Sequence, residues 1–251
     1  MLIDTHSHID MIEQDAAFLV KEAKDFGVEK IIVPSADRSS YEKVISLCSQ
    51  FEEVYGALGV HPSEVLKAKD EDYEIIKDLV KVNKKIVAVG EIGLDYYWDK
   101  TFVKEQKDAF KRQIKIAQDL SLPILIHDRD AHFDSFEIIK DIKDIPVIMH
   151  CFSGSLDFAK ECIKCGFFIA IGGVVTFKNA KKMKEVAKEI PLDYLLLETD
   201  APYLTPEPFR GKENHPAYVK YVAQEIANLR GISFEQVEEV TNQNAKRIFK
   251  F

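Results

Sequence analysis

Residues 2–8, with the sequence LIDTHSH, join an apolar pair to two histidines, His6 and His8, that are spaced two positions apart. Side chains at this spacing in a β-strand point to the same face, so the two imidazoles would face one metal ion. The same pair also arises by chance, or as hydrogen-bonded core histidines. The metal interpretation therefore requires carboxylates and further histidines at equivalent positions downstream.

The segment at 2–8 is the first of eight short β-rich runs that alternate with amphipathic stretches. Apolar residues recur at helical spacing in 14–26 and in 102–120. Strands that alternate with helices are typically parallel, and runs that are almost entirely apolar indicate strands buried on both faces. Eight such units in about 250 residues predict one α/β domain, residues 1–251, folded as a (β/α)8 TIM barrel, with a doubly wound open sheet as the alternative. The other seven runs are 29–34, 54–60, 86–91, 123–127, 146–150, 167–172 and 194–199.

The chain after the eighth run contains a long loop and two predicted helices. The helices are expected at 214–229 and 233–248, and Ser233 is placed to cap the second. The loop, residues 200–214, is the longest segment without periodicity and contains the sequence PYLTPEPFRG. In a barrel, this position is that of an active-site loop.

The composition is that of a soluble globular protein with a full core, since 46% of the residues are hydrophobic and 30% are charged. No run of about 18 apolar residues exists. The first β-rich run begins at residue 2, which leaves no room for a signal peptide. We therefore expect a cytoplasmic protein without membrane-spanning segments.

The charge and the cysteines exclude other classes. A net charge of -8 argues against an extended surface that coats nucleic acid, although a local basic pocket for phosphates stays open. Four cysteines without an export signal do not indicate a disulfide framework. Cys162 and Cys165 form a C-x-x-C, but no second pair matches it and the pattern around it is helical. We interpret both as reduced residues that pack in a helix.

Six potential metal ligands lie at or near the carboxyl ends of the predicted strands. These ends meet on one face of a barrel, so six scattered residues would form a cluster of four imidazoles and two carboxylates. As capping or core residues, each would instead need its own buried partner. The six are His6 and His8 in the first run, Glu91, His127 and His150 at the ends of the fourth, fifth and sixth, and Asp200 after the eighth.

The size of this set predicts two ions, because one catalytic zinc typically has three protein ligands. Glu91 would be the bridging carboxylate. Two divalent ions give the pocket an excess of positive charge, which suits an anionic substrate and a bound hydroxide. Imidazole ligands favour Zn, Mn, Co or Fe over Mg, whereas Mg is abundant, so the metal is not identified. One ion would take His6, His8 and Asp200, and the other His127 and His150.

Six ordered motifs extend this reading: HSH at 6–8, GVHP at 59–62, GEIGLDY at 90–96, HDRDA at 127–131, HCFSG at 150–154 and ETDAPYL at 198–204. In these motifs the chain resembles the TatD family of metal-dependent deoxyribonucleases over essentially its whole length. The resemblance implies a TIM barrel of the amidohydrolase-like group, two or more divalent metals, and hydrolysis of DNA phosphodiesters, exonucleolytic in some members. It also implies the same six residues as ligands. Our own prediction is that Glu91, as the bridge, and Asp200 are the catalytic residues.

Other residues are candidates for substrate binding. His61, at the end of the third run, would contact a phosphate or support a ligand. Arg129, just past the fifth run, has a fork of donors for a phosphate, or it pairs with a neighbouring aspartate. Arg210 and Lys212 lie in the loop after the eighth run, and the resemblance favours Arg210 for substrate contact. Residues 95–98, DYYW, would offer a stacking surface for a base or pack as an ordinary loop.

Three functions fit these patterns. The first is a phosphodiesterase that cleaves DNA from a single-stranded end, with a metal-bridging hydroxide as nucleophile and Asp200 to orient or deprotonate the water. The second is an amidohydrolase-type hydrolase of esters, amides or aminoacyl esters, because the metal site alone does not choose between phosphorus and carbon. The third is a barrel that binds metal or a partner without catalysis, which the intact ligand set disfavours. No obligate protein partner is predicted.

Overall fold

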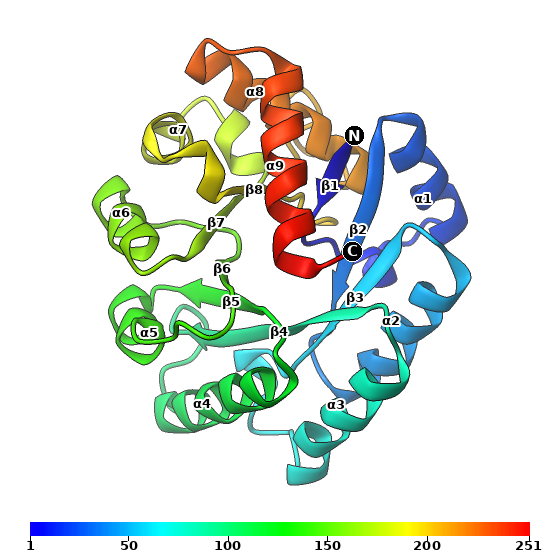
Figure 1. Ribbon diagram of the computed structural model, residues 1–251, viewed down its shortest axis with the longest axis vertical. Coiled ribbons are helices and arrows are strands. Elements are labelled where there is room, and N and C mark those ends of the chain that lie inside the picture. The colour runs from blue at the N-terminus through cyan, green and yellow to red at the C-terminus, as the bar shows by residue number, and fades with distance from the viewer.

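The computed structural model describes residues 1–251 and contains one sheet of eight parallel strands in the order β1 to β8. Figure 1 shows helices around the outside of these strands. The architecture is a (β/α)8 TIM barrel, which confirms the predicted fold class and excludes the doubly wound alternative. The strands are β1 (Leu2–Asp4), β2 (Val28–Pro34), β3 (Val54–Leu58), β4 (Ile86–Asp95), β5 (Ile124–Arg129), β6 (Val147–Met149), β7 (Phe168–Ile171) and β8 (Leu195–Leu197).

Three of the four helices predicted from periodicity lie within two residues of their expected bounds. The prediction at 214–229 began too early, because a 3-10 turn at Pro216–Tyr218 precedes the helix. Ser233 caps the last helix as expected, in a capping box with Gln236. The helices are α1 (Ala16–Asp25), α2 (Arg38–Gln50), α3 (Asp70–Val82), α4 (Val103–Leu120), α5 (His132–Ile139), α6 (Leu156–Lys164), α7 (Lys181–Glu189), α8 (Val219–Arg230) and α9 (Phe234–Phe249).

The barrel is closed by the segments that follow β1 and β8. Ser7 and Ala201 form a parallel bridge, and the Thr5 amide donates to the Leu197 carbonyl at 3.0 Å. The expected strand at 2–8 was therefore too long, because regular β1 ends at Asp4 and the next residues pair irregularly with the end of β8. This pairing places the two ends of the barrel wall, 192 residues apart in sequence, beside each other.

Helix α9 closes the amino-terminal end of the barrel. It crosses the front of the strands in Figure 1, and Ala245, Ile248 and Phe249 belong to the same buried cluster as the inward-facing residues of the strands. A second and larger cluster fills the space between the strands and the outer helices. Because α9 occupies one opening, only the carboxyl end of the barrel is left for a binding site.

Two smaller predictions concern the helices. Cys162 is buried on α6 and Cys165 follows its last residue, and both are free thiols. This agrees with their interpretation as helix-packing residues.

None of the helices is both long enough and apolar enough to span a membrane.

Strand β4 does not end at Glu91 as the sequence pattern predicted, but continues to Asp95 alongside β5. One extra residue of β4 is accommodated between Val89 and Ile92, where the pairing register with β5 shifts. Such a bulge turns a side chain out of the regular alternation, and Glu91 lies within it. The extension then requires glycine at 93, where φ is +143° and a Cβ would lie 2.0 Å from the His127 carbonyl oxygen.

We expect Gly93→Ala to lower the free energy of unfolding by at least about 3 kcal/mol, because it combines a backbone conformation reserved for glycine with a backbone clash. Gly166→Ala is the matched control. Its φ is +87° but nothing lies within 4 Å of the added carbon, so about 1 kcal/mol is expected. Urea unfolding of both variants measures the difference, and equal losses would contradict the close approach of β4 to β5.

Candidate metal centre

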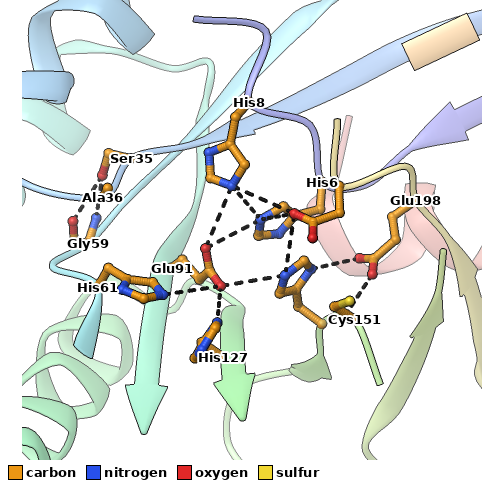
Figure 2. A network of polar contacts seen from close by, with 12 residues as sticks. His6, His8, Ser35, Ala36, Gly59, His61, Glu91, His127, Cys151 and Glu198 are labelled. Atoms are coloured by element: carbon orange, nitrogen blue, oxygen red, sulfur yellow. Dashed lines mark hydrogen bonds and ion pairs between the residues drawn. The ribbon is translucent and has the colours of Figure 1, made fainter. Parts of the chain in front are cut away.

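The six predicted ligands meet at the carboxyl end of the barrel, around the carboxylate of Glu91. Figure 2 shows Glu91 between His8 and His6 on one side and His61 and His127 on the other. These side chains come from segments that are far apart in sequence, and the parallel strands bring their ends together. Glu91 and the imidazoles of His6, His8 and His150 are almost fully buried.

The two oxygens of Glu91 face different imidazoles. Oε2 lies 3.5 Å from His6 Nε2 and 3.8 Å from His8 Nε2. Oε1 lies 2.6 Å from His127 Nδ1 and 3.5 Å from His150 Nε2. One carboxylate thus divides four imidazoles into two pairs.

Asp200 completes the group on the His6 side. Its Oδ1 lies 3.8 Å from both His8 Nε2 and His150 Nε2, and 4.0 Å from His6 Nε2. The backbone of Asp200 has a φ of +57°, a conformation that aspartate adopts more readily than most residues. Its amide donates to the His6 carbonyl at 2.9 Å, so the same contact that closes the barrel fixes the position of this carboxylate.

Glu198 is a part of the site that the sequence analysis missed. Its Oε2 accepts a hydrogen bond from His150 Nδ1 at 3.0 Å, and its Oε1 accepts from the Cys151 amide at 2.6 Å. This contact fixes the orientation of the imidazole and leaves Nε2 facing Glu91. A carboxylate that ends the apolar run LLLE was the available signal, and it is the same signal that identified Glu91.

Asp95 has a comparable role that differs from the predicted one. Residues 95–98 were considered as a stacking surface, yet Asp95 itself is buried and its Oδ2 lies 2.9 Å from His127 Nε2. His127 therefore contacts a carboxylate at each ring nitrogen, Glu91 through Nδ1 and Asp95 through Nε2. The imidazolium form is the one that donates on both sides.

His61 lies inside the cluster as well. Its Nε2 is 3.9 Å from Glu91 Oε1, and its ring contacts that of His127 with centroids 4.4 Å apart. Its Nδ1 faces Ser63 Oγ at 2.7 Å. His61 is thus in the position of a ligand or a supporting residue, beside the His127 side of Glu91.

The two candidate arginines lie in different surroundings. The Arg129 guanidinium is stacked over the Tyr97 ring, 4.0 Å from its centroid, and Asp128 pairs with His132 instead. The alternative of a salt bridge between Arg129 and Asp128 is therefore wrong. Arg210 lies over the Phe177 ring at 3.9 Å and donates to the Thr205 carbonyl, which ties it to its own loop.

The ionisation of the cluster follows from burial and from mutual charge. Burial would raise the pKa of Glu91, but the neighbouring imidazoles of His150, His127 and His6 hold it well below its ordinary value. Burial would lower the pKa of His127, but Glu91 and Asp95 raise it to about 9. Burial would also lower the pKa of His150, but Glu198 and Glu91 raise it to about 10. His127 and His150 thus hold protons at neutral pH in the absence of a metal.

The pKa values of His61 and His6 shift in the opposite direction from those of His127 and His150. Burial lowers the pKa of His61 to about 3 and holds that of His6 well below its ordinary value. Burial raises the pKa of Asp200 to about 6 against the charges of His150 and His8. Without a cation, the cluster thus needs protons on two imidazoles to balance its buried carboxylates.

The donor set fits divalent metal ions. Three donor atoms lie within 4.8 Å of one another in each of the sets His6–Glu91–His150, His6–His8–Asp200 and His61–Glu91–His127. The rings of His6 and His150 are stacked with centroids 3.4 Å apart, and His6 Nε2 lies 3.3 Å from His8 Nε2. Imidazole nitrogens repel one another at such distances unless a proton or a cation lies between them.

Comparisons with known proteins agree with this chemistry. The family model described as TatD related DNase matches residues 3–250. The chain is 46% identical to the uncharacterized metal-dependent hydrolase YabD of Bacillus subtilis (strain 168), covering 100% of this chain and 99% of that protein. It is 34% identical to the uncharacterized metal-dependent hydrolase YcfH of Escherichia coli (strain K12), covering 99% and 95%.

A solved structure extends the agreement to three dimensions. The crystal structure of YjjV, a TatD homologue from Escherichia coli K12, superimposes with a TM-score of 0.95 at 32% identity, covering 100% of this chain and 98% of that one. Barrel, cluster and relatives together define a metal-dependent hydrolase. The chain belongs to the TatD-related DNase family, whose model spans nearly all of it.

We expect metal binding to release protons and to strengthen as pH rises. His127 and His150, with pKa values of about 9 and 10, carry protons at neutral pH that a metal must displace. At pH 7 we expect about one to two protons released per chain on binding of Mn²⁺, with affinity lost progressively as pH falls. Titration calorimetry in buffers of different ionisation enthalpy counts these protons. Binding that releases no protons, or an affinity that weakens as pH rises from 6 to 8, would contradict the assignment of His127 and His150 as ligands.

Proposed function

We propose that this hydrolase is a deoxyribonuclease that cleaves phosphodiester bonds from a single-stranded DNA end with two divalent metal ions. Two ions are supported by the contacts of Glu91, because its Oε1 and its Oε2 face different imidazoles. A carboxylate whose two oxygens face different imidazoles could be shared by two divalent ions. The family model points to DNA as the substrate class.

The proposed ligand assignment follows the contacts of Glu91. Asp95 and Glu198 would orient the two imidazole ligands of one ion, His127 and His150. Each carboxylate contacts the ring nitrogen that does not face Glu91. When bound, the ions would acidify a water molecule and neutralise charge on the phosphoryl oxygens. The ligand softness of imidazole favours Zn, Mn, Co or Fe over Mg. One ion would bind His6, His8 and Asp200, the other His127 and His150, with Glu91 shared.

Asp200 is the proposed proton acceptor. In the metal-free protein burial raises the pKa of its carboxyl to about 6, and a bound cation would lower it and keep the carboxylate ionised as a proton acceptor. Its carboxylate is partly accessible, with 14% of the side chain exposed, whereas Glu91 is 5% exposed. Asp200 is thus the more accessible of the two carboxylates to an attacking water.

Substrate phosphates would be held by few cations. Arg129 has no carboxylate partner and leaves its donors free, and His61 lies beside the proposed second ion. Arg210 lies in the loop after β8, where the Thr205 carbonyl and the Phe177 ring, which follows β7, hold it, and it would approach the substrate from that loop. With 42 acidic against 34 basic residues, contact confined to a strand end fits better than an extended groove.

A second candidate is an ester, amide or aminoacyl-ester hydrolase on the same pair of ions. The acidic net charge of -8 favours it, because a small or neutral substrate needs no basic surface. The two candidates require the same ligands and differ only in the bond that is broken. They are therefore separated by assay rather than by geometry.

The number of ions is tested by elemental analysis of protein loaded with Mn²⁺ or Zn²⁺. We expect about two ions per chain in the wild type and a loss of both in Glu91→Ala, because one carboxylate serves both ions. Glu161→Gln, on the surface of α6, is the matched control and should retain two. A wild-type value of one would refute the bridging role.

Catalysis is tested with Asp200→Asn, which keeps an oxygen for the metal but removes the base. We expect turnover of 5′- and 3′-labelled single-stranded DNA to fall about 10²–10⁴-fold while melting temperature and metal content persist. The same preparations are assayed on a carboxylic ester and an aminoacyl-tRNA. Hydrolysis of these substrates with none of DNA, under each divalent ion in turn, would replace the proposed function by the second candidate.

A further inference from the structure

The mouth of the barrel carries most of the exposed large apolar side chains of this protein. Nine such residues are at least half exposed, and six of them lie in the segments that follow β1, β3, β4, β5 and β8. Monomeric proteins expose single apolar residues everywhere, but a concentration on one face indicates a binding surface. The six are Met11, Leu66, Tyr97, Trp98, Phe133 and Tyr203.

Tyr97, Trp98 and Arg129 contact one another at the mouth of the barrel, and we call these three residues the aromatic platform. The Tyr97 and Trp98 rings meet edge to face, with centroids 4.9 Å apart. The Arg129 guanidinium lies 4.0 Å from the Tyr97 centroid and 5.4 Å from that of Trp98. Trp98 nevertheless remains 73% exposed. Packing within the protein therefore does not account for the position of this ring.

The backbone beneath the platform is rigidly held. Asp95 Oδ1 accepts from the Tyr97 amide at 2.9 Å and from the Trp98 amide at 3.3 Å. The backbone of Asp95 is in turn bound on both sides by Gln106. An exposed aromatic pair on a fixed backbone loses little conformational entropy when a ligand stacks on it.

The same aspartate connects the platform to the metal centre. Asp95 Oδ2 lies 2.9 Å from His127 Nε2, while its Oδ1 holds the platform backbone. Arg129 also lies two residues after His127 and pairs with Asp95 in the β4–β5 register. The platform is thus connected to His127, a proposed ligand, through a single side chain, that of Asp95.

We propose that the aromatic platform stacks an unpaired nucleobase next to the scissile phosphate, with Arg129 bound to the adjoining phosphate. The inference rests on the proposed function and specifies how that site selects its substrate. Two aromatic rings and a guanidinium without an acidic partner match the alternation of base and phosphate in a single strand. A paired base cannot stack there, so the platform selects frayed or single-stranded ends.

Trp98 is the only tryptophan in the chain, so its fluorescence reports on the platform directly. Binding of a short single-stranded oligonucleotide to the Mn²⁺-loaded protein is followed by anisotropy of a label on the DNA and by Trp98 emission. We expect natural DNA to quench the emission, and an oligonucleotide with abasic sugars at its last two positions to bind more weakly without quenching. DNA binding that leaves the emission unchanged would overturn the inference and assign the rim to another partner, such as a protein.

Cleavage supplies the second readout. The wild type should prefer the natural end over the abasic end by about 10–100-fold in kcat/KM, and Tyr97→Ala combined with Trp98→Ala should abolish this preference through KM while abasic cleavage persists. Phe18→Ala, which removes an exposed aromatic residue of α1, is the matched control and should keep the preference.

The two failures are distinguishable. Cleavage of both ends at equal rates, or a preference that survives the double substitution, would overturn the platform while leaving the nuclease intact. Absence of any DNA cleavage would refute the proposed function. In that case quenching by natural but not abasic DNA still decides whether the platform recognises bases.

Discussion

A carboxylate remains charged inside a protein only when cations or hydrogen-bond donors surround it, and the site of this barrel is built around that constraint. Glu91 is buried at the barrel mouth and is surrounded by imidazoles from β1, β3, β5 and β6 or the segments that follow them. Two of these imidazoles are in turn fixed by a further carboxylate, His150 by Glu198 and His127 by Asp95. Removing Glu91 would leave these imidazoles without a common partner.

The sequence was sufficient for the fold and for the convergence of the six ligands. Both follow from rules that act locally, namely the alternation of strand and helix and the meeting of parallel strand ends. The bulge that aims Glu91, and the continuation of β4 to Asp95, depend on pairing with β5 and were not predictable from one run alone. The same holds for β1, whose end is determined by contacts with Leu197 and Ala201.

Residues that orient the ligands were harder to recognise than the ligands themselves. Glu198 follows an apolar run as Glu91 does, but it lies inside the predicted eighth run, 194–199, whereas the predicted ligand Asp200 lies just beyond that run. Asp95 was grouped with the aromatic residues after it, although its own side chain points to His127. Whether an aromatic residue in a loop is buried or exposed also depends on neighbouring loops, so the exposure of Trp98 beside the buried Asp95 required the structure.

The closure of the barrel has a consequence for synthesis of the chain. Thr5 and Leu197, whose contact joins the two ends of the wall, are 192 residues apart. At ribosomal rates of roughly 5–20 residues per second, the first histidines would wait roughly 10–40 s for the strand beside them. Helix α9, which fills the opposite opening, emerges later still. A nascent chain therefore exposes His6 and His8 as an incomplete pair, and the full set of ligands assembles only at the end of translation.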